Sequence, residues 1–323
     1  MNNGSFVISL DYELMWGVRD KRTKEDYGDA IVGGKKATCE MLKLFDQFKV
    51  SATFATVGFL FHKDKNKLLS NSPEIKPTYN NINLSPYPSI SKYVGKNEIE
   101  DPYHFGYKLI EQIKNNPLHE LATHTYCHYY CLEPGQNTEQ FEADLKKAFN
   151  VAKENAVKIH SIVFPRNQYS EAHLKICKQF GITSYRGNEV HYIYNTGNGE
   201  KQTPLRRALR LLDSYINITG YHCYTKGYIK KSFPYNIPSS RFLRPYQKKL
   251  SFLEGLKIRR IKRSMTYAAK NKMVYHLWWH PHNFGRNTEE NLKNLKSIFD
   301  HYKYLNDKYN FESLTMKELT GKL

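Results

Sequence analysis

The sequence lacks the features that mark membrane, secreted and disulfide-rich proteins. Its 323 residues contain no run of about 18 apolar residues, so no membrane-spanning helix is expected. The N-terminal stretch MNNGSFVISLDYELMWG lacks the pattern of a signal peptide, which is a basic start followed by an apolar stretch and a small-residue cleavage site. We therefore do not expect an exported precursor. The five cysteines are odd in number and show no CxxC spacing, which argues against a disulfide framework and favours a reducing compartment. These absences predict a cytoplasmic protein.

Acidic residues are scarce in one part of the chain. Residues 201–272 hold 18 lysines and arginines but only two acids, Asp213 and Glu254, so this basic segment carries +16 of the net charge of +18. Such a segment is either a solvated surface or a face that attracts phosphates, nucleic acid or anionic lipid. Within it, residues 250–270 predict a helix with an apolar stripe and basic flanks, which could also lie on an anionic membrane surface.

The composition, 40% hydrophobic and 14% aromatic, indicates a packed core, and strand-like and helix-like stretches alternate along the chain. The predicted strands are 5–14, 51–61, 161–165, 182–187 and 273–279. The predicted helices are 33–50, 104–116, 138–156, 170–181 and 287–309. This alternation predicts an α/β fold with parallel strands. We expect one domain over residues 1–323, with a surface insertion at about 71–103 that is rich in Asn, Ser and Pro.

Two histidines lie four residues apart in ELATHTYCHYYC. His124 and His128 would share one face of a helical turn and could bind one metal ion. Two purely structural histidines are the alternative, since 13 histidines make this spacing common. Cys131 would lie about 10 Å from His124 on a helix, too far to share an ion, so we interpret Cys127 and Cys131 as packing residues. Any metal site therefore needs a ligand from elsewhere in the chain.

Other ionisable residues follow strand-like stretches. Asp11 and Glu13 are two apart, so they point to the same side of a strand, where paired carboxylates are costly unless they are bound. In YHLWWHPHNFG, His280 ends a strand that also carries His276, and a histidine there could act as a general acid. Arg166 follows another strand and could pair with a carboxylate. Exposed or structural roles are the alternatives for each of these residues.

The ordered set of an acidic strand end, HTYCH, FPRNQ and WWHPH resembles the polysaccharide deacetylase family, which is carbohydrate esterase family 4-like. The resemblance runs from the first strand to about residue 285. The stretches DPYHFGYKLIEQI, HTYCHYYCLEPGQ and FPRNQ are most similar to members associated with bacterial surface-polysaccharide biosynthesis, that is, of lipopolysaccharide or capsule. The resemblance to this family implies a distorted (β/α)7-type barrel. It also implies metal-dependent removal of N-acetyl, or less often O-acetyl, groups from sugars.

The resemblance also assigns roles to individual residues. It implies a divalent metal ion, with Zn²⁺ as the expected metal. The implied ligands of this ion are Glu13, His124 and His128. The implied catalytic residues are Asp11 as base, Arg166 to orient it, His280 as acid and Asp213 to support His280. The spacing of the first motif leaves open an exchange of roles between Asp11 and Glu13. The implied partner is an N-acetylated sugar, and a nucleotide-linked sugar, a lipid-diphosphate-linked sugar and a finished polymer all stay open. The basic helix at residues 250–270, and not the resemblance, suggests peripheral contact with an anionic membrane.

Three other functions compete with this interpretation. A cytosolic metal-dependent amidohydrolase of a small metabolite would use the same site on another bond. A basic nucleic-acid-binding protein would explain the charge, but no nucleic-acid-binding motif is present, and we expect no nucleic-acid partner. A catalytically inactive sugar-binding relative would keep the fold without the chemistry.

Overall fold

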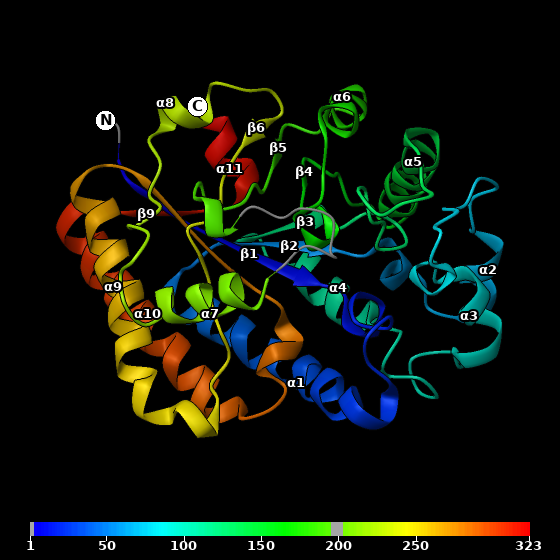
Figure 1. Cartoon of the computed structure of the whole chain (residues 1–323), viewed down its shortest axis with the longest axis horizontal. Helices are drawn as coiled ribbons and strands as arrows, with labels where there is room; N and C mark the ends of the chain where they lie inside the picture. Colours follow the sequence, from blue (N-terminus) through cyan, green and yellow to red (C-terminus); the bar gives the residue numbers. More distant parts are fainter. Residues whose placement is uncertain (1–2, 195–202) are drawn as a thin grey trace.

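The computed structural model describes residues 3–194 and 203–323, so the first two residues of the basic segment lie outside the described part (Figure 1). The described strands form one sheet in the order β6-β5-β4-β3-β2-β1-β8-β7, with β9 also beside β1, and its strand pairs are parallel. The strands are β1 (Ser5–Tyr12), β2 (Ala52–Thr56), β3 (His119–Thr123), β4 (Ser161–Ile162), β5 (Ser184–Tyr185), β6 (Tyr235–Asn236), β7 (Arg241–Phe242), β8 (Val274–Trp279) and β9 (Glu312–Leu314).

A short link joins the two ends of this sheet. Residues 237–240 connect β6 to β7, and the link bonds to strands on both sides: Ile237 N donates to Tyr185 O at 2.9 Å and Ser240 N donates to His276 O at 2.7 Å. The curled parallel sheet with outer helices is the predicted α/β, (β/α)-barrel architecture. The path holds eight strands where the resemblance implied seven, and two of them, β6 and β7, are two-residue strands in a segment without a strand pattern.

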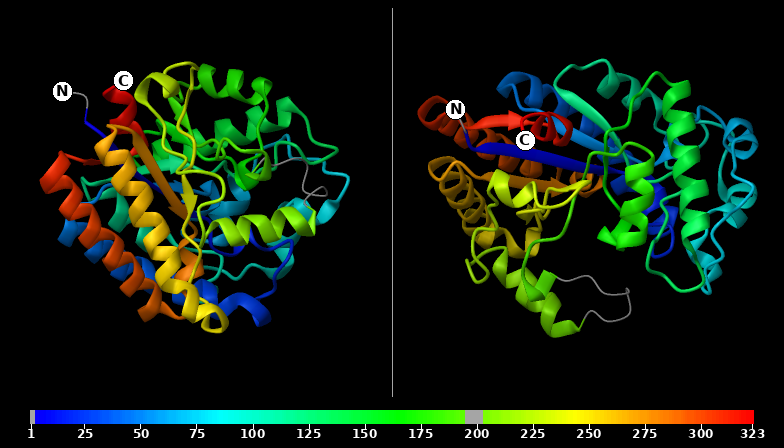
Figure 2. Two further views of the ribbon diagram at one scale, coloured as in Figure 1. Left: turned by 60° about the vertical axis from the view of Figure 1, so that its left-hand side comes forward. Right: turned by 90° about the horizontal axis from the view of Figure 1, so that it is seen from above.

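The helices cover the outside of the sheet. The longer ones are α1 (Lys24–Phe48), α4 (Tyr107–Lys114), α5 (Thr138–Glu154), α6 (Glu171–Gln179), α7 (Pro204–Asp213), α9 (Glu254–Lys270) and α10 (Thr288–Tyr309). The short ones are α2 (Lys65–Ser70), α3 (Tyr87–Tyr93), α8 (Lys226–Ile229) and α11 (Met316–Gly321). Helices α1, α9 and α10 gather on one flank, away from α5 and α6 (Figures 1 and 2). Within the described ranges, no helix has the length and apolar character needed to cross a bilayer.

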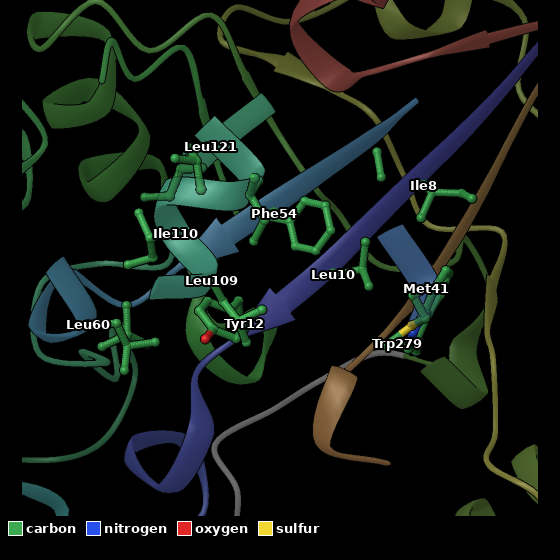
Figure 3. Packing of buried hydrophobic residues seen from close by; sticks show 14 of the residues in the cluster. Ile8, Leu10, Tyr12, Met41, Phe54, Leu60, Leu109, Ile110, Leu121 and Trp279 are labelled. Atoms are coloured by element: carbon green, nitrogen blue, oxygen red, sulfur yellow. The ribbon is translucent and has the colours of Figure 1, made fainter. Parts of the chain in front are cut away.

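Strand β1 shows why polar groups end up inside the barrel. Its side chains alternate between two faces. Leu10 and Tyr12 join the large hydrophobic cluster that packs against the helices, together with Phe54 of β2 (Figure 3). Ser9 and Asp11 point to the opposite face, which is the barrel interior, and both are buried. The alternation of a single strand therefore delivers a carboxylate to the interior at the carboxyl end of β1.

Helix α1 begins nine residues before the predicted start at residue 33. Thr23 caps it through a capping box with Asp26, where the Asp26 carboxylate accepts from Thr23 N at 2.8 Å. Gly33 and Gly34, the first two residues of the predicted helix, lie inside α1. A Cβ at Gly33 would overlap with the carbonyl oxygen of Gly285, so the glycine permits close approach of the chain after β8.

The basic helix α9 is only partly the solvated amphipathic helix that its pattern predicted. The predicted stripe of Ile258, Ile261 and Met265 is buried. Lys257 and Arg260, expected in water, are buried as well: Lys257 Nζ donates to Arg244 O at 2.9 Å and Arg260 Nη2 to Gly220 O at 2.5 Å. Both side chains thus donate hydrogen bonds to backbone carbonyl groups of neighbouring loops. The periodicity of side chains along the helix does not reveal such contacts.

Candidate active site

The predicted site residues lie around one cavity at the carboxyl ends of the strands. The cavity has a volume of about 1190 Å³. Asp11, Glu13, His124, His128 and His280 all line it. Parallel strands bring their carboxyl ends to one rim, so residues that follow β1, β3 and β8 meet there although they are far apart in the sequence. Asp213, which was also predicted, is absent from the lining.

Glu13, His124 and His128 form a compact buried cluster. One ligand atom from each lies within 4.8 Å of the others. Glu13 Oε2 is 3.0 Å from His128 Nε2 and 3.3 Å from His124 Nε2. His124 Nδ1 donates to Val163 O at 2.8 Å, so Nε2 is the ring nitrogen that faces the Glu13 carboxylate. The Val163 contact thus orients the His124 ring with its free edge toward Glu13 and His128, the orientation that a metal ligand needs.

A glycine leaves room for this cluster. A Cβ added to Gly17 would overlap with the Glu13 carboxylate. Gly17 lies in the turn Leu14–Gly17 that directly follows Glu13, so the chain folds back over its own carboxylate. The close approach of this turn to Glu13 therefore depends on a residue without a side chain.

The two histidines lie in a loop after β3, and the expectation of a helical turn is wrong. Thr125 and His128 both have a positive φ of 63°, which a helix does not allow. Two carboxylate oxygens of Asp144 on α5 hold the loop by accepting from Tyr126 N at 2.7 Å and Cys127 N at 3.0 Å. Side-chain hydrogen bonds from a neighbouring helix thus replace the helical hydrogen bonds that the spacing suggested.

The two cysteines of this loop are buried in the hydrophobic core. Cys127 and Cys131 are 1% and 0% exposed and belong to the main cluster of apolar side chains. Burial raises the pKa of both thiols well above the usual value, so they stay protonated at neutral pH. They lie where packing residues would lie and outside the cluster of possible metal ligands.

Asp144 should make stability depend on pH. Burial raises its pKa from 3.8 to about 6, so the folded chain holds the proton more tightly than the unfolded chain. Stability from this group is complete below about pH 4 and is lost as the pH rises through about 6, a loss of about 3 kcal/mol. The unfolding free energy of the wild type minus that of Asp144→Asn should fall by this amount between pH 4 and 7 in urea titrations. A constant difference would contradict the raised pKa.

Asp11 pairs with Arg186, an arginine that the sequence reasoning did not single out. Arg186 Nη1 donates to Asp11 Oδ1 at 2.7 Å and Nη2 donates to Asp11 Oδ2 at 2.8 Å. Nη2 also donates to Asn167 Oδ1 at 3.1 Å, and the guanidinium lies 4.0 Å from the Trp278 ring centroid. Burial would raise the pKa of Asp11, but the Arg186, His124 and His280 charges outweigh it and lower the pKa. The available signal was an arginine at the end of the predicted strand 182–187.

Arg166 contacts other carboxylates, so the expectation that it orients Asp11 is not what the contacts support. Its guanidinium pairs with Asp20 and, at 2.7 Å, with Glu133 Oε1, and it stacks over the Tyr130 ring at 4.0 Å. Arg166 itself has a φ of 55° and lies in the turn Pro165–Asn167. The chain after β4 therefore presents Asn167 to Arg186 and turns the Arg166 side chain to another wall of the cavity.

His280 approaches both carboxylates. Its Nε2 lies 3.6 Å from Asp11 Oδ2 and 3.6 Å from Glu13 Oε1, and its side chain is 25% exposed. The His282 ring stacks beside it with centroids 5.1 Å apart. Burial lowers the pKa of His282 to about 4, so His282 is neutral at pH 7. His280 is thus the more accessible of the two histidines and lines the cavity.

Asp213 does not support His280. It is fully buried at the end of α7 and accepts from Arg241 Nη1 at 2.5 Å, Tyr194 OH at 2.6 Å and Thr219 Oγ1 at 2.9 Å. These contacts outweigh burial and hold its pKa well below the usual value. The carboxylate is the counter-charge of a buried arginine and anchors α7, a role that its position in the sequence does not indicate.

Glu13 is ionised and His128 is neutral at pH 7. Burial would raise the pKa of Glu13, but the His280 charge and the hydrogen bonds from His124 and His128 hold the pKa well below the usual range. Burial also lowers the pKa of His128 to about 4. A carboxylate and neutral imidazoles are the protonation states that a metal ion requires of its ligands.

Comparisons with known proteins identify the same family as the motifs. A family model described as polysaccharide deacetylase matches residues 26–185, a range that includes the two histidines and Arg166 but not Asp11, Glu13 or His280. A search of curated proteins found no match.

Solved structures share the fold at low sequence identity. A Mycobacterium smegmatis protein described as a polysaccharide deacetylase has a TM-score of 0.61 and 12% identity, covering 100% of this chain and 91% of that one. A Pseudomonas aeruginosa PAO1 protein described in the same way has a TM-score of 0.54 and 9% identity, covering 98% and 89%. A GH57-type branching enzyme from Pyrococcus horikoshii has a TM-score of 0.55 and 12% identity, covering 100% and 70%. At these identities the likeness concerns the fold alone.

Proposed function

From the premise that the chain belongs to the polysaccharide deacetylase family and is a deacetylase, we propose that it removes N-acetyl groups from a sugar in a metal-dependent hydrolysis. The observation that carries the proposal is the meeting of Asp11, Glu13, His124, His128 and His280 around one cavity. Hydrolysis of an amide needs a base, an acid and a group that polarises the carbonyl, and this set of side chains can supply all three. The same site could also act on O-acetyl groups.

The residues fit a divalent metal ion. Glu13, His124 and His128 would bind it, and the orientation of His124, with Nε2 toward the ionised Glu13, supports this assignment. Two imidazoles and one carboxylate suit Zn²⁺ and leave a position open. A bound ion would supply Lewis-acid polarisation of the acetyl carbonyl and of a water molecule.

Asp11 would act as the base. Arg186 keeps it ionised and fixes its plane through two parallel hydrogen bonds. Asp11 takes a proton from the attacking water, and the water oxygen forms a bond to the acetyl carbon. An exchange of roles between Asp11 and Glu13 is disfavoured in this proposal, because the carboxylate close to both histidines is that of Glu13.

His280 would act as the acid. In its protonated form it donates a proton to the sugar nitrogen as the bond between that nitrogen and the acetyl carbon breaks. The products are acetate and an amino sugar, and the proton on Asp11 balances the one that His280 gives up. The position of His280 beside Asp11 and Glu13, at the open side of the cavity, supports this role.

We place the reaction in the cytoplasm, in the biosynthesis of a bacterial surface polysaccharide. The support is the resemblance of the motifs and the five cysteines, all of them free. Contact with an anionic membrane stays a prediction. Because Lys257 and Arg260 are buried, only part of the basic face of α9 is available for such contact.

The proposal is tested with the purified protein, a panel of N-acetylated sugars and metal analysis. We expect about one divalent ion per chain and release of acetate that stops when a chelator removes the ion and resumes when Zn²⁺ is restored. Acetate release that is unaffected by chelation, or a panel without acetate release from the metal-loaded protein, would contradict the proposal. Deacetylation of small amide metabolites but of no sugar would favour the amidohydrolase.

A further inference from the structure

One wall of the cavity is formed by arginines. Arg207 and Arg210 lie three residues apart on α7 and so share one face of the helix, and Arg244 follows β7. All three line the cavity that contains Asp11 and His280. This arginine wall belongs to the basic segment noted in the sequence, whereas the exposed basic residues of α9 are absent from the lining.

Two side chains of the arginine wall have no matching carboxylate among the described residues. Within the described ranges, the side chains of Arg207 and Arg244 have no hydrogen-bond or salt-bridge partner. Burial lowers the pKa of Arg210 and of Arg244, and the charges of Arg207 on Arg210 and of Arg210 on Arg244 act in the same direction. Arg207 is exposed and Arg244 is half-buried, and like charges held together on one wall raise the free energy of the empty site.

Two described acids of this region, Asp213 and Glu189, form no ion pair with Arg207 or Arg244. The Asp213 carboxylate accepts hydrogen bonds from Arg241, Tyr194 and Thr219. Glu189 is buried, and burial raises its pKa, which favours its uncharged form. On another wall of the same cavity, by contrast, Arg166 is paired with Asp20 and Glu133. The unpaired charges of Arg207 and Arg244 therefore lie in the part of the cavity formed by α7 and the chain after β7.

We propose that the arginine wall is a subsite for a phosphoryl group attached to the sugar, an inference that rests on the proposed function. Guanidinium groups bind phosphate oxygens through paired hydrogen bonds. Arg207 and Arg244 together match a phosphate or diphosphate better than a single carboxylate, which would neutralise only one charge. The cavity of about 1190 Å³ also exceeds the roughly 300–1,000 Å³ of most small-ligand pockets, which leaves room for a sugar and its phosphoryl group.

Binding of inorganic pyrophosphate tests the subsite without any turnover. Calorimetry should show binding to the wild type and a loss of affinity of about tenfold or more in Arg207→Gln/Arg244→Gln, since charge-assisted hydrogen bonds are removed. The matched control is Arg259→Gln/Arg263→Gln, which removes two charges from a separate hollow on α9 and should bind like the wild type. Equal affinity in all three proteins, or the same loss in the control, would overturn the proposal.

A second measurement separates the subsite from the proposed function. The ratio of kcat/KM for an N-acetylhexosamine 1-phosphate to that for its neutral methyl glycoside should fall about tenfold in Arg207→Gln/Arg244→Gln and stay constant in the control. The same ratio for a prenol-diphosphate-linked sugar in detergent distinguishes a lipid-borne phosphate from a soluble one, and a fall in either ratio supports the subsite.

The two proposals can fail independently. If pyrophosphate binding depends on the arginines but no sugar releases acetate, the subsite proposal is supported and the proposed deacetylation is contradicted. Acetate release with the same ratios in all three proteins, or a preference for a hexuronic acid without any response to phosphate, would remove the subsite and leave the deacetylation. Circular dichroism of each variant verifies that it is folded.

Discussion

His124→Ala and His128→Ala should each lose the bound divalent ion and the deacetylase activity together. Each variant removes one of the ligand atoms that lie within 4.8 Å of one another, and no other histidine belongs to that cluster in the described ranges. Loss of metal polarisation removes several kcal/mol of transition-state stabilisation, so kcat/KM should fall by about 10³-fold or more. Metal analysis after dialysis and initial rates of acetate release measure the two effects.

The controls lie in the same loop. Cys127→Ser and Cys131→Ser should keep the metal and most of the activity at a cost in stability, because both thiols are packed in the core. Glu13→Ala should lose the metal as the histidine variants do. If the serine variants lost the metal while Glu13→Ala retained it, the ion would be bound by other residues.

Asp11→Asn should lower kcat by about 10²- to 10⁴-fold while the ion stays bound, because the amide cannot take a proton from water. KM should change much less than kcat, since the amide keeps the size of the carboxylate. Steady-state kinetics and metal analysis of the same preparation provide the test. Metal loss in Asp11→Asn together with metal retention in Glu13→Gln would show that the two carboxylates have exchanged roles.

Arg186 should act through Asp11 as a positioning residue. Arg186→Lys keeps the charge but cannot make both hydrogen bonds, so kcat should fall by about 10- to 100-fold with the metal still bound. Arg166→Lys is the comparison, because Arg166 pairs with Asp20 and Glu133 instead, and its effect on kcat should be smaller. A larger effect at Arg166 would return the orienting role to the residue that the motif indicated.

Much of the site follows from local patterns in the sequence. The two-residue period of a strand places Asp11 on the interior face and directs Glu13 to the same cavity. The alternation of strands and helices predicts parallel strands whose carboxyl ends meet, which is why residues after β1, β3 and β8 lie together. The motifs also identified the family that the family model matches.

The sequence alone determined the α/β class, the pair of carboxylates and the location of the excess charge, because each depends on short-range periodicity or composition. The barrel followed from the resemblance of the motifs, and the conformation of the histidine loop followed from neither. Only the tertiary structure decided which arginine pairs with which carboxylate. Arg186 and Asp11 are 175 residues apart, and Arg241 reaches Asp213 across 28 residues. An arginine side chain is long and can turn to any of several carboxylates nearby. Its partner is set by the packing of whole strands and loops, which no local pattern encodes.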